Sequence, residues 1–226
     1  MSTNKLLTYA LNAEKQLVYV NNVPNGLECN CICPGCKQQL IAKNAGGIRE
    51  HHFAHKCDME CSSGYQTMIH LLAEEIIVEN GIIPGFSING KPVMARQIAY
   101  EVHLPELNIV PDIFAVVPIT INYGNFASVV RDIPFILEIF VTHKVDEKKA
   151  GIIKNAGIPA VEIDLSESES NTKEDLIKDI YNSVHWNYIN KTIGQNFIPQ
   201  MVYGSRYPQG YNYSRHRPYY YYKKCR

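Results

Sequence analysis

The feature that most constrains this chain is a carboxylate in the middle of an apolar run, Glu138 in Phe135-Ile-Leu-Glu-Ile-Phe-Val141. A second apolar run begins directly after Asp112. Both runs are short and rich in β-branched and aromatic residues, so they are predicted to be neighbouring strands of a buried sheet. Solvation at a strand end is an alternative for Asp112, but apolar residues flank Glu138 on both sides. Because a buried carboxylate is costly unless it is paired or bound to a metal, the two acids are candidates for holding one hard divalent cation.

The N-terminal third contains a second potential metal site, made of cysteine and histidine. Cys33-x2-Cys36 is followed after fifteen residues by His52-x2-His55, a spacing typical of small structural zinc modules. Cys33 and Cys36 are the firmest ligand candidates. The remaining ligands are expected among His52, His55, Cys57 and Cys61. Scattered reduced thiols and surface histidines are the alternative, and Cys29 and Cys31 are expected to stay outside the site as reduced thiols.

Three blocks of the sequence resemble known families. Pro111-Asp112 followed by Glu138-x-Phe140 is similar to the PD-(D/E)XK nuclease core. A second resemblance is to the CoiA-like competence family. It is carried by Val141–Lys149, by Gly157–Leu165, and by the Cys33-Pro-Gly-Cys36 segment with His51–His55. The resemblance implies an α/β fold with a restriction-endonuclease-like mixed sheet flanked by helices, preceded by a small zinc-binding β module.

The resemblance also implies a chemistry. Asp112 and Glu138 would lie side by side at the mouth of a parallel sheet and bind catalytic Mg²⁺ or Mn²⁺, which activates water for phosphodiester hydrolysis. The nuclease motif places Lys two residues after the acid, and CoiA-like proteins can carry Gln there, whereas this chain has Phe140. Phe140 shares the face of Glu138 on a strand but cannot do the work of Lys. Lys144 and His143 at the strand end are the candidates to replace that Lys, and Lys148 or Lys149 on the next predicted helix could also reach the site. An ordinary surface or phosphate-contacting role is the alternative for Lys144 and His143.

A helix is predicted over 65–80 from its wide apolar face, ended by Gly81 and Pro84. His70 and Glu74 are four residues apart and therefore neighbours on this helix. By the resemblance, Glu74 or Glu75 would bring a further acid to the metal, and His70 matches a position where CoiA-like proteins tend to have His. A solvated helix face is the alternative for all three.

The remaining elements outline three parts of the chain, 1–63, 64–200 and 201–226. Hairpins are expected over 5–20 and around Asn89-Gly90, and a hairpin or an insertion around Gly124-Asn125. A helix over 145–156 between the Glu138 strand and a strand over 160–165 predicts a right-handed parallel crossover. A last helix is expected after Thr172.

Charge and composition restrict the partners. The net charge is zero, yet residues 203–226 carry six Lys/Arg and no acid, together with eight Tyr. The tail is expected to be disordered alone, and its aromatics and cations are typical of contacts with single-stranded nucleic acid; a solubilising extension or a docking segment for a protein partner is the alternative. No apolar run has membrane-spanning length and no signal peptide is apparent, so the chain is expected in the cytoplasm.

Three function classes follow. The first is a metal-dependent DNA endonuclease of the CoiA type, acting in DNA uptake, recombination or defence on single- or double-stranded DNA. The second is a nuclease-like module that binds nucleic acid without cutting it, which Phe140 favours. The third is a protein-interaction subunit of a larger complex.

Overall fold

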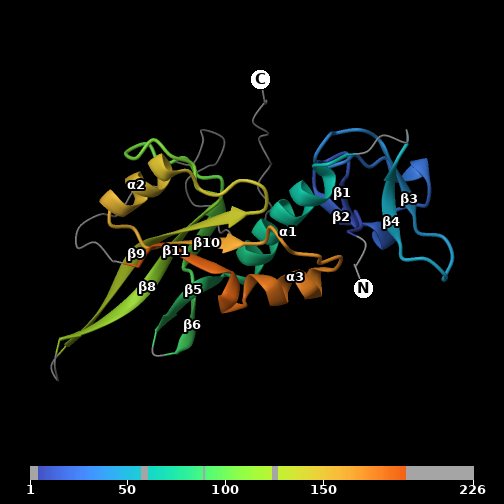
Figure 1. Cartoon of the computed structure of the whole chain (residues 1–226). Helices are drawn as coiled ribbons and strands as arrows, with labels where there is room; N and C mark the ends of the chain where they lie inside the picture. The colour runs from blue at the N-terminus through green and yellow to red at the C-terminus, as the bar shows by residue number, and fades with distance from the viewer. Residues whose placement is uncertain (1–4, 57–60, 89, 124–126, 192–226) are drawn as a thin grey trace. The chain divides into compact units, whose positions relative to one another are not determined.

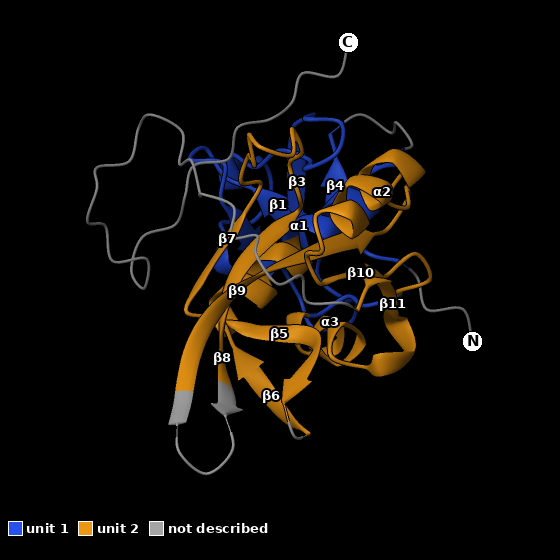
Figure 2. Ribbon diagram, turned by 90° about the vertical axis from the view of Figure 1, so that its left-hand side faces the viewer, with its two compact units in different colours: residues 1–71, 169–172, 208–226 blue, residues 72–168, 173–207 orange. Residues whose placement is uncertain are grey.

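The computed structural model describes residues 5–56, 61–88, 90–123 and 127–191. The chain divides into two compact units, residues 1–71 with 169–172 and 208–226, and residues 72–168 with 173–207 (Figure 2). The division falls inside the helix α1, Gly64–Asn80. Cys57 and the tail 201–226 lie outside the described residues.

The first unit is built from short hairpins (Figure 1). The expected N-terminal hairpin is confirmed, with Tyr9 paired to Tyr19 in an antiparallel register. A second antiparallel hairpin sets Leu40 opposite His55. Apolar side chains and three buried cysteines form the small core beneath them. The strands are β1 (Tyr9–Leu11), β2 (Leu17–Tyr19), β3 (Leu40–Lys43) and β4 (His52–His55), and two 3-10 turns cover Val20–Asn22 and Leu27–Cys29.

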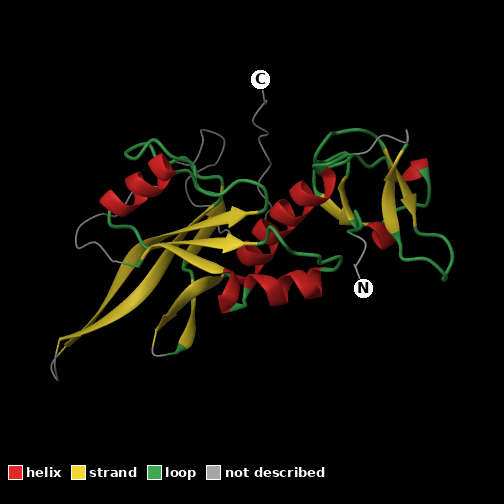
Figure 3. Cartoon of the chain, viewed as in Figure 1, coloured by secondary structure: helices red, strands yellow, loops and turns green. Residues whose placement is uncertain are grey.

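The second unit is organised around a mixed sheet, whose strands are among those drawn in yellow in Figure 3. It has five strands in the order β11-β10-β9-β8-β7. The α/β class is therefore confirmed. A separate two-stranded hairpin, β5 with β6, surrounds the Asn89-Gly90 position as expected. The elements are β5 (Ile82–Ile88), β6 (Lys91–Met94), β7 (Gln97–Tyr100), β8 (Ile113–Tyr123), β9 (Ala127–Phe140), α2 (Glu147–Asn155), β10 (Ala160–Asp164), α3 (Lys173–Ile180), a 3-10 turn at Ser183–His185, and β11 (Trp186–Asn190).

The crossover from β9 through α2 to β10 was expected from the sequence, and β9 and β10 pair in parallel. The helix begins later than the predicted position 145, because Asp146 is its N-cap and accepts a hydrogen bond from the Lys149 backbone N–H at 2.7 Å. Gly157, with φ of 66°, follows the end of the helix and lets the chain turn toward β10.

One expectation about the sheet is wrong. Asp112 and Glu138 were expected at the mouth of a parallel sheet, but β8 pairs antiparallel with β9 along its whole length, from Ile113 to Tyr123. The hairpin expected around Gly124-Asn125 is confirmed by its two strands, because Tyr123 at the end of β8 pairs antiparallel with Ala127 at the start of β9. Residues 124–126 themselves lie outside the described residues. Strand β11 was not predicted, because its sequence Trp-Asn-Tyr-Ile-Asn lacks a continuous apolar pattern.

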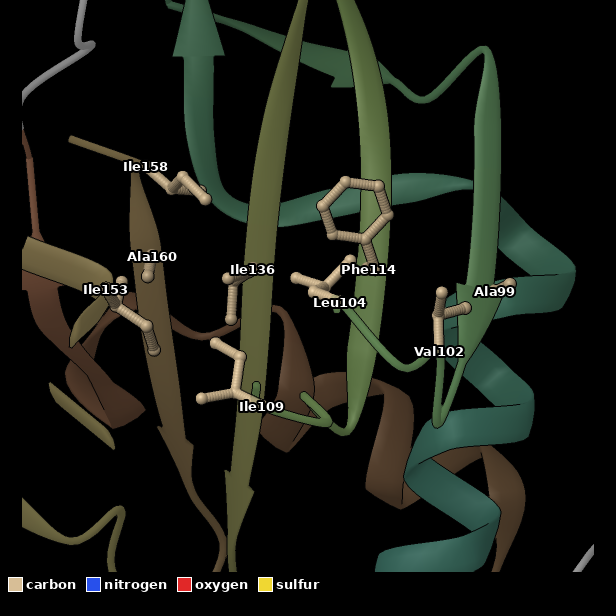
Figure 4. Packing of buried hydrophobic residues seen from close by; sticks show 9 residues of the cluster. All are labelled: Ala99, Val102, Leu104, Ile109, Phe114, Ile136, Ile153, Ile158 and Ala160. Atoms are coloured by element: carbon tan, nitrogen blue, oxygen red, sulfur yellow. The ribbon is translucent and has the colours of Figure 1, made fainter. Parts of the chain in front are cut away.

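The core on the α2 side of the sheet fixes which side chains share a face. Ile153 of α2 packs with Phe114, Ile136 and Ala160, which come from β8, β9 and β10 (Figure 4). Side chains alternate along a strand, so residues two positions from these point to the same face. Among the described residues, none of the helices combines the length and the apolar character needed to cross a membrane.

Candidate functional site

Three carboxylates line up across adjacent strands. Ile113 of β8 pairs with Leu137 of β9, which brings Asp112, immediately before β8, opposite Glu138. In the parallel ladder Glu138 pairs with Glu162 of β10. Residues opposite each other in a ladder project from the same face, so Asp112, Glu138 and Glu162 form a row, which we call the acid row.

Glu138 is the buried centre of the acid row. Its side chain is 6% exposed, and its Oε2 accepts a hydrogen bond from Lys149 Nζ at 2.6 Å. Its Oε1 is buried and has no hydrogen-bond partner among the described residues. Burial raises the pKa of Glu138 to about 7, and the negative charge of Asp112 adds to this rise, while Lys149 opposes it.

Asp112 is held at the end of the sheet by backbone contacts. Its Oδ2 accepts a hydrogen bond from the Ile139 N–H at 2.7 Å, and its carbonyl accepts one from Glu101 N–H at 2.9 Å. These contacts fix the carboxylate beside the strand that carries Glu138. The Asp112 carboxylate therefore has a defined position beside β9.

Helix α1 adds a further acid. Glu74 is 1% exposed, and its carboxylate, that of Asp112 and a ring nitrogen of His70 all lie within 4.8 Å of one another. Carboxylate oxygens and an imidazole are ligands for a divalent cation. The three residues were sequence candidates, and the structure brings them together. Glu138 is not a member of this 4.8 Å group.

The remaining candidates lie at the end of the strand that carries Glu138. His143 and Lys144 are exposed. Lys144 Nζ lies 5.1 Å from the centroid of the Phe140 ring, a cation–π contact. Lys149, which the sequence offered only as one of several substitutes, does contact the acid row, through Glu138.

The Cys/His segment forms the second candidate centre. Cys33, Cys36, His55 and Cys61 each present a ligand atom, and all four atoms lie within 4.8 Å of one another. Cys36 Sγ is 3.2 Å from His55 Nε2, and Cys33 Sγ is 3.8 Å from Cys61 Sγ. A Cys3His set is compatible with tetrahedral zinc.

Local structure explains why these four side chains meet. The Cys33 carbonyl accepts a hydrogen bond from Lys37 N–H at 3.0 Å, which closes a tight turn around the first pair. Gly64 lies so close to the cysteines that a Cβ there would be 3.0 Å from Cys33 Sγ. Burial raises the pKa of the Cys33 thiol to about 12, so the metal-free thiol stays protonated.

One ligand candidate, His52, and the two further cysteines Cys29 and Cys31 lie outside this group. His52 lies outside the group, and its Nδ1 is 2.9 Å from the Glu50 carbonyl oxygen. Cys29 and Cys31 are buried, and the Cys31 thiol contacts the Cys29 carbonyl at 3.1 Å. Both are free thiols outside the Cys3His group, as expected.

Glu162 was not proposed as a site residue from the sequence, although it carries the same signal as Glu138. It is an acid between apolar residues in Ala160-Val-Glu-Ile163, and it is 5% exposed. The parallel pairing that sets it beside Glu138 could not be read as a register from sequence alone.

Comparisons of this chain with protein-family models, with curated proteins and with solved structures give no match.

Proposed function

We propose that this protein is a metal-dependent nuclease of the CoiA-like type, which hydrolyses phosphodiester bonds of DNA. The observation that carries the proposal is the 2.6 Å contact between Lys149 Nζ and the buried Glu138 carboxylate, beside Asp112. The PD-(D/E)XK resemblance calls for two acids and one ammonium. This chain supplies the ammonium from α2 in place of position 140.

The donor set fits a hard divalent cation. A buried carboxylate oxygen without a hydrogen bond, as at Glu138 Oε1, is unfavourable unless another partner satisfies it. Asp112 and Glu138 would hold Mg²⁺ or Mn²⁺, with Glu74 and His70 grouped around Asp112. When bound, such a cation supplies Lewis-acid chemistry, which polarises a phosphate and lowers the pKa of water.

Lys149 has two roles in the proposal. Its positive charge favours the ionised form of Glu138, which is the form that binds a cation. An ammonium has three donors, so one hydrogen bond to Glu138 leaves others for a water or a phosphate oxygen. Its side chain is 20% exposed, which allows access from solvent.

The sheet is consistent with the same proposal. The acids lie on β9 and at the start of β8, and the connection that follows β9 is a helix leading to a parallel strand. We propose that this mixed sheet is the restriction-endonuclease-like core implied by the resemblance. The Cys3His centre would hold a structural zinc, because all four of its ligands come from protein side chains.

The test uses the full-length protein with Mg²⁺ or Mn²⁺ on circular, linear and single-stranded DNA. Glu138→Ala is the inactivating variant, and Glu106→Ala, an exposed acid outside the site, is the matched control. We expect cleavage by wild type and by Glu106→Ala but not by Glu138→Ala. Equal cleavage by Glu138→Ala would point to another site or a contaminant. Binding of DNA by wild type without any cleavage would favour the non-cutting module.

A further inference from the structure

We propose that Glu162 is a positioning residue that holds the start of helix α2 and thereby directs Lys149 onto Glu138. The proposal rests on the proposed function only for what Lys149 does in a reaction. The placement of Lys149 itself is a structural claim that can be tested without activity.

The burial of the Glu162 carboxylate in a strand needs a physical explanation. It is 5% exposed and belongs to β10, where it pairs with Glu138 in the parallel ladder. Acids are rarely buried in a strand unless a specific contact compensates their desolvation. A second acid beside Glu138 also adds negative charge next to a carboxylate that is already buried. Retaining Glu162 there therefore requires a compensating contact.

That contact is to the segment before α2. Glu162 Oε1 accepts a hydrogen bond from the Val145 N–H at 2.7 Å. Val145 directly precedes Asp146, whose side chain caps α2 by accepting from Lys149 N–H. The acceptor is a buried side chain of a sheet strand, so this short hydrogen bond can fix the entry of the chain into the helix.

The three contacts form a continuous link from β10 to β9 through the helix. Glu162 holds Val145, Asp146 holds the first turn, and Lys149 in that turn reaches Glu138 Oε2 at 2.6 Å. Lysine has a long flexible side chain, so the position of its backbone decides which acid it reaches. Loss of the Glu162 contact would leave the start of α2 free to shift and Lys149 without a fixed partner.

Two conservative variants of Glu162 separate the effect of side-chain length from the effect of charge. Glu162→Gln keeps an oxygen at the same distance but loses the charge, whereas Glu162→Asp keeps the charge but is one methylene shorter. If positioning matters, Gln should retain kcat within about threefold and Asp should behave like Glu162→Ala. Retention by Asp and loss by Gln would show that the charge is what counts and would overturn the proposal.

The link to Lys149 is tested by a double-mutant cycle. We expect Glu162→Ala to lower kcat by at least tenfold with KM little changed, and to cause no further loss in a Lys149→Ala background. If the fold-loss of kcat in the double variant equals the product of the two single losses, Glu162 acts independently of Lys149. That result would contradict the proposal.

A second readout does not depend on cleavage. Reductive methylation of lysines, followed residue by residue by mass spectrometry, reports how accessible each ammonium is. We expect Lys149 to react slowly in wild type and in Glu162→Gln, and faster in Glu162→Ala and Glu162→Asp, with the exposed Lys148 as the internal reference. This pattern in a protein that does not cut DNA would support positioning while rejecting the nuclease. Unchanged Lys149 reactivity in well-folded Glu162→Ala and Glu162→Asp would overturn the positioning role.

Discussion

The ammonium of Lys149 lies 2.6 Å from the buried carboxylate of Glu138, although eleven positions separate the two residues in the chain. Helix α2 supplies this cation from above the sheet, while position 140 on the strand holds an aromatic ring. The ammonium that contacts the acid row thus comes from the helix and not from position 140.

Replacing Lys149 should abolish most activity. We expect Lys149→Ala to lower kcat by about 10²–10³-fold, the range for removing one preorganised charge-stabilising group. The exposed neighbour Lys148 provides the matched control, and Lys148→Ala should stay close to wild type. Steady-state cleavage of one DNA substrate by the three proteins measures the effect. Similar losses in both variants would indicate general DNA binding in place of a specific role.

Phe140→Lys should restore activity to Lys149→Ala. Residue 140 is two positions from Glu138 on β9, so its side chain leaves the same face of the strand. A lysine there could offer the missing ammonium, and we expect at least tenfold recovery relative to Lys149→Ala. Phe140→Leu in the same background is the control without a charge. No recovery with lysine would mean that the strand position cannot reach the reacting groups in this chain.

Protein without added divalent cations should lose stability as pH rises from about 5 to 7. The pKa of Glu138 is raised to about 7 in the folded protein, so the folded state binds more protons than the unfolded state in this window. Stability therefore falls with pH at up to about 1.4 kcal/mol per pH unit from this group. Urea unfolding at several pH values measures the slope, and Glu138→Gln should make it shallower. An unchanged slope in that variant would show that Glu138 titrates normally.

One zinc per chain is expected in the Cys3His centre. Metal analysis of protein purified without chelator should give close to one equivalent, and Cys33→Ser/Cys36→Ser should lose it. His52→Ala should retain the metal, because the His52 ring contacts the Glu50 carbonyl and lies outside the group. Loss of zinc in His52→Ala but not in His55→Ala would reverse the assignment of the histidine ligand.

The sequence predicts the strand pair that carries Asp112 and Glu138 because uninterrupted apolar runs have few alternatives to a buried sheet. The helix with His70 and Glu74 is also predictable, since its apolar residues follow the helical period. These local patterns carry most of the fold of the second unit.

The finer arrangement depends on contacts that local patterns do not encode. The direction of the β8–β9 pairing, the polar strand β11 and the partnership of Glu162 with Glu138 are all set by register between distant segments. Lys149 could not be singled out from its neighbour Lys148, because which of two adjacent helical residues faces the sheet depends on where the helix starts. Asp146 determines where α2 starts, because its side chain caps the helix.

The two connections of β9 differ in length, and therefore in the entropic cost of closing them. Three residues join it to β8, whereas nineteen residues, 141–159, join it to β10. Short loops close at lower entropic cost, so we expect Asp112 and Glu138 to meet early and Lys149 and Glu162 to join them late. Ile153→Val in α2 should then mainly speed unfolding, whereas Val117→Ala in β8 should slow folding, which stopped-flow chevrons would separate. Before α2 packs on the sheet, the carboxylates of Asp112 and Glu138 would face each other without the Lys149 ammonium. Low pH would protonate them and remove their repulsion, so it should favour early formation of the β8–β9 hairpin.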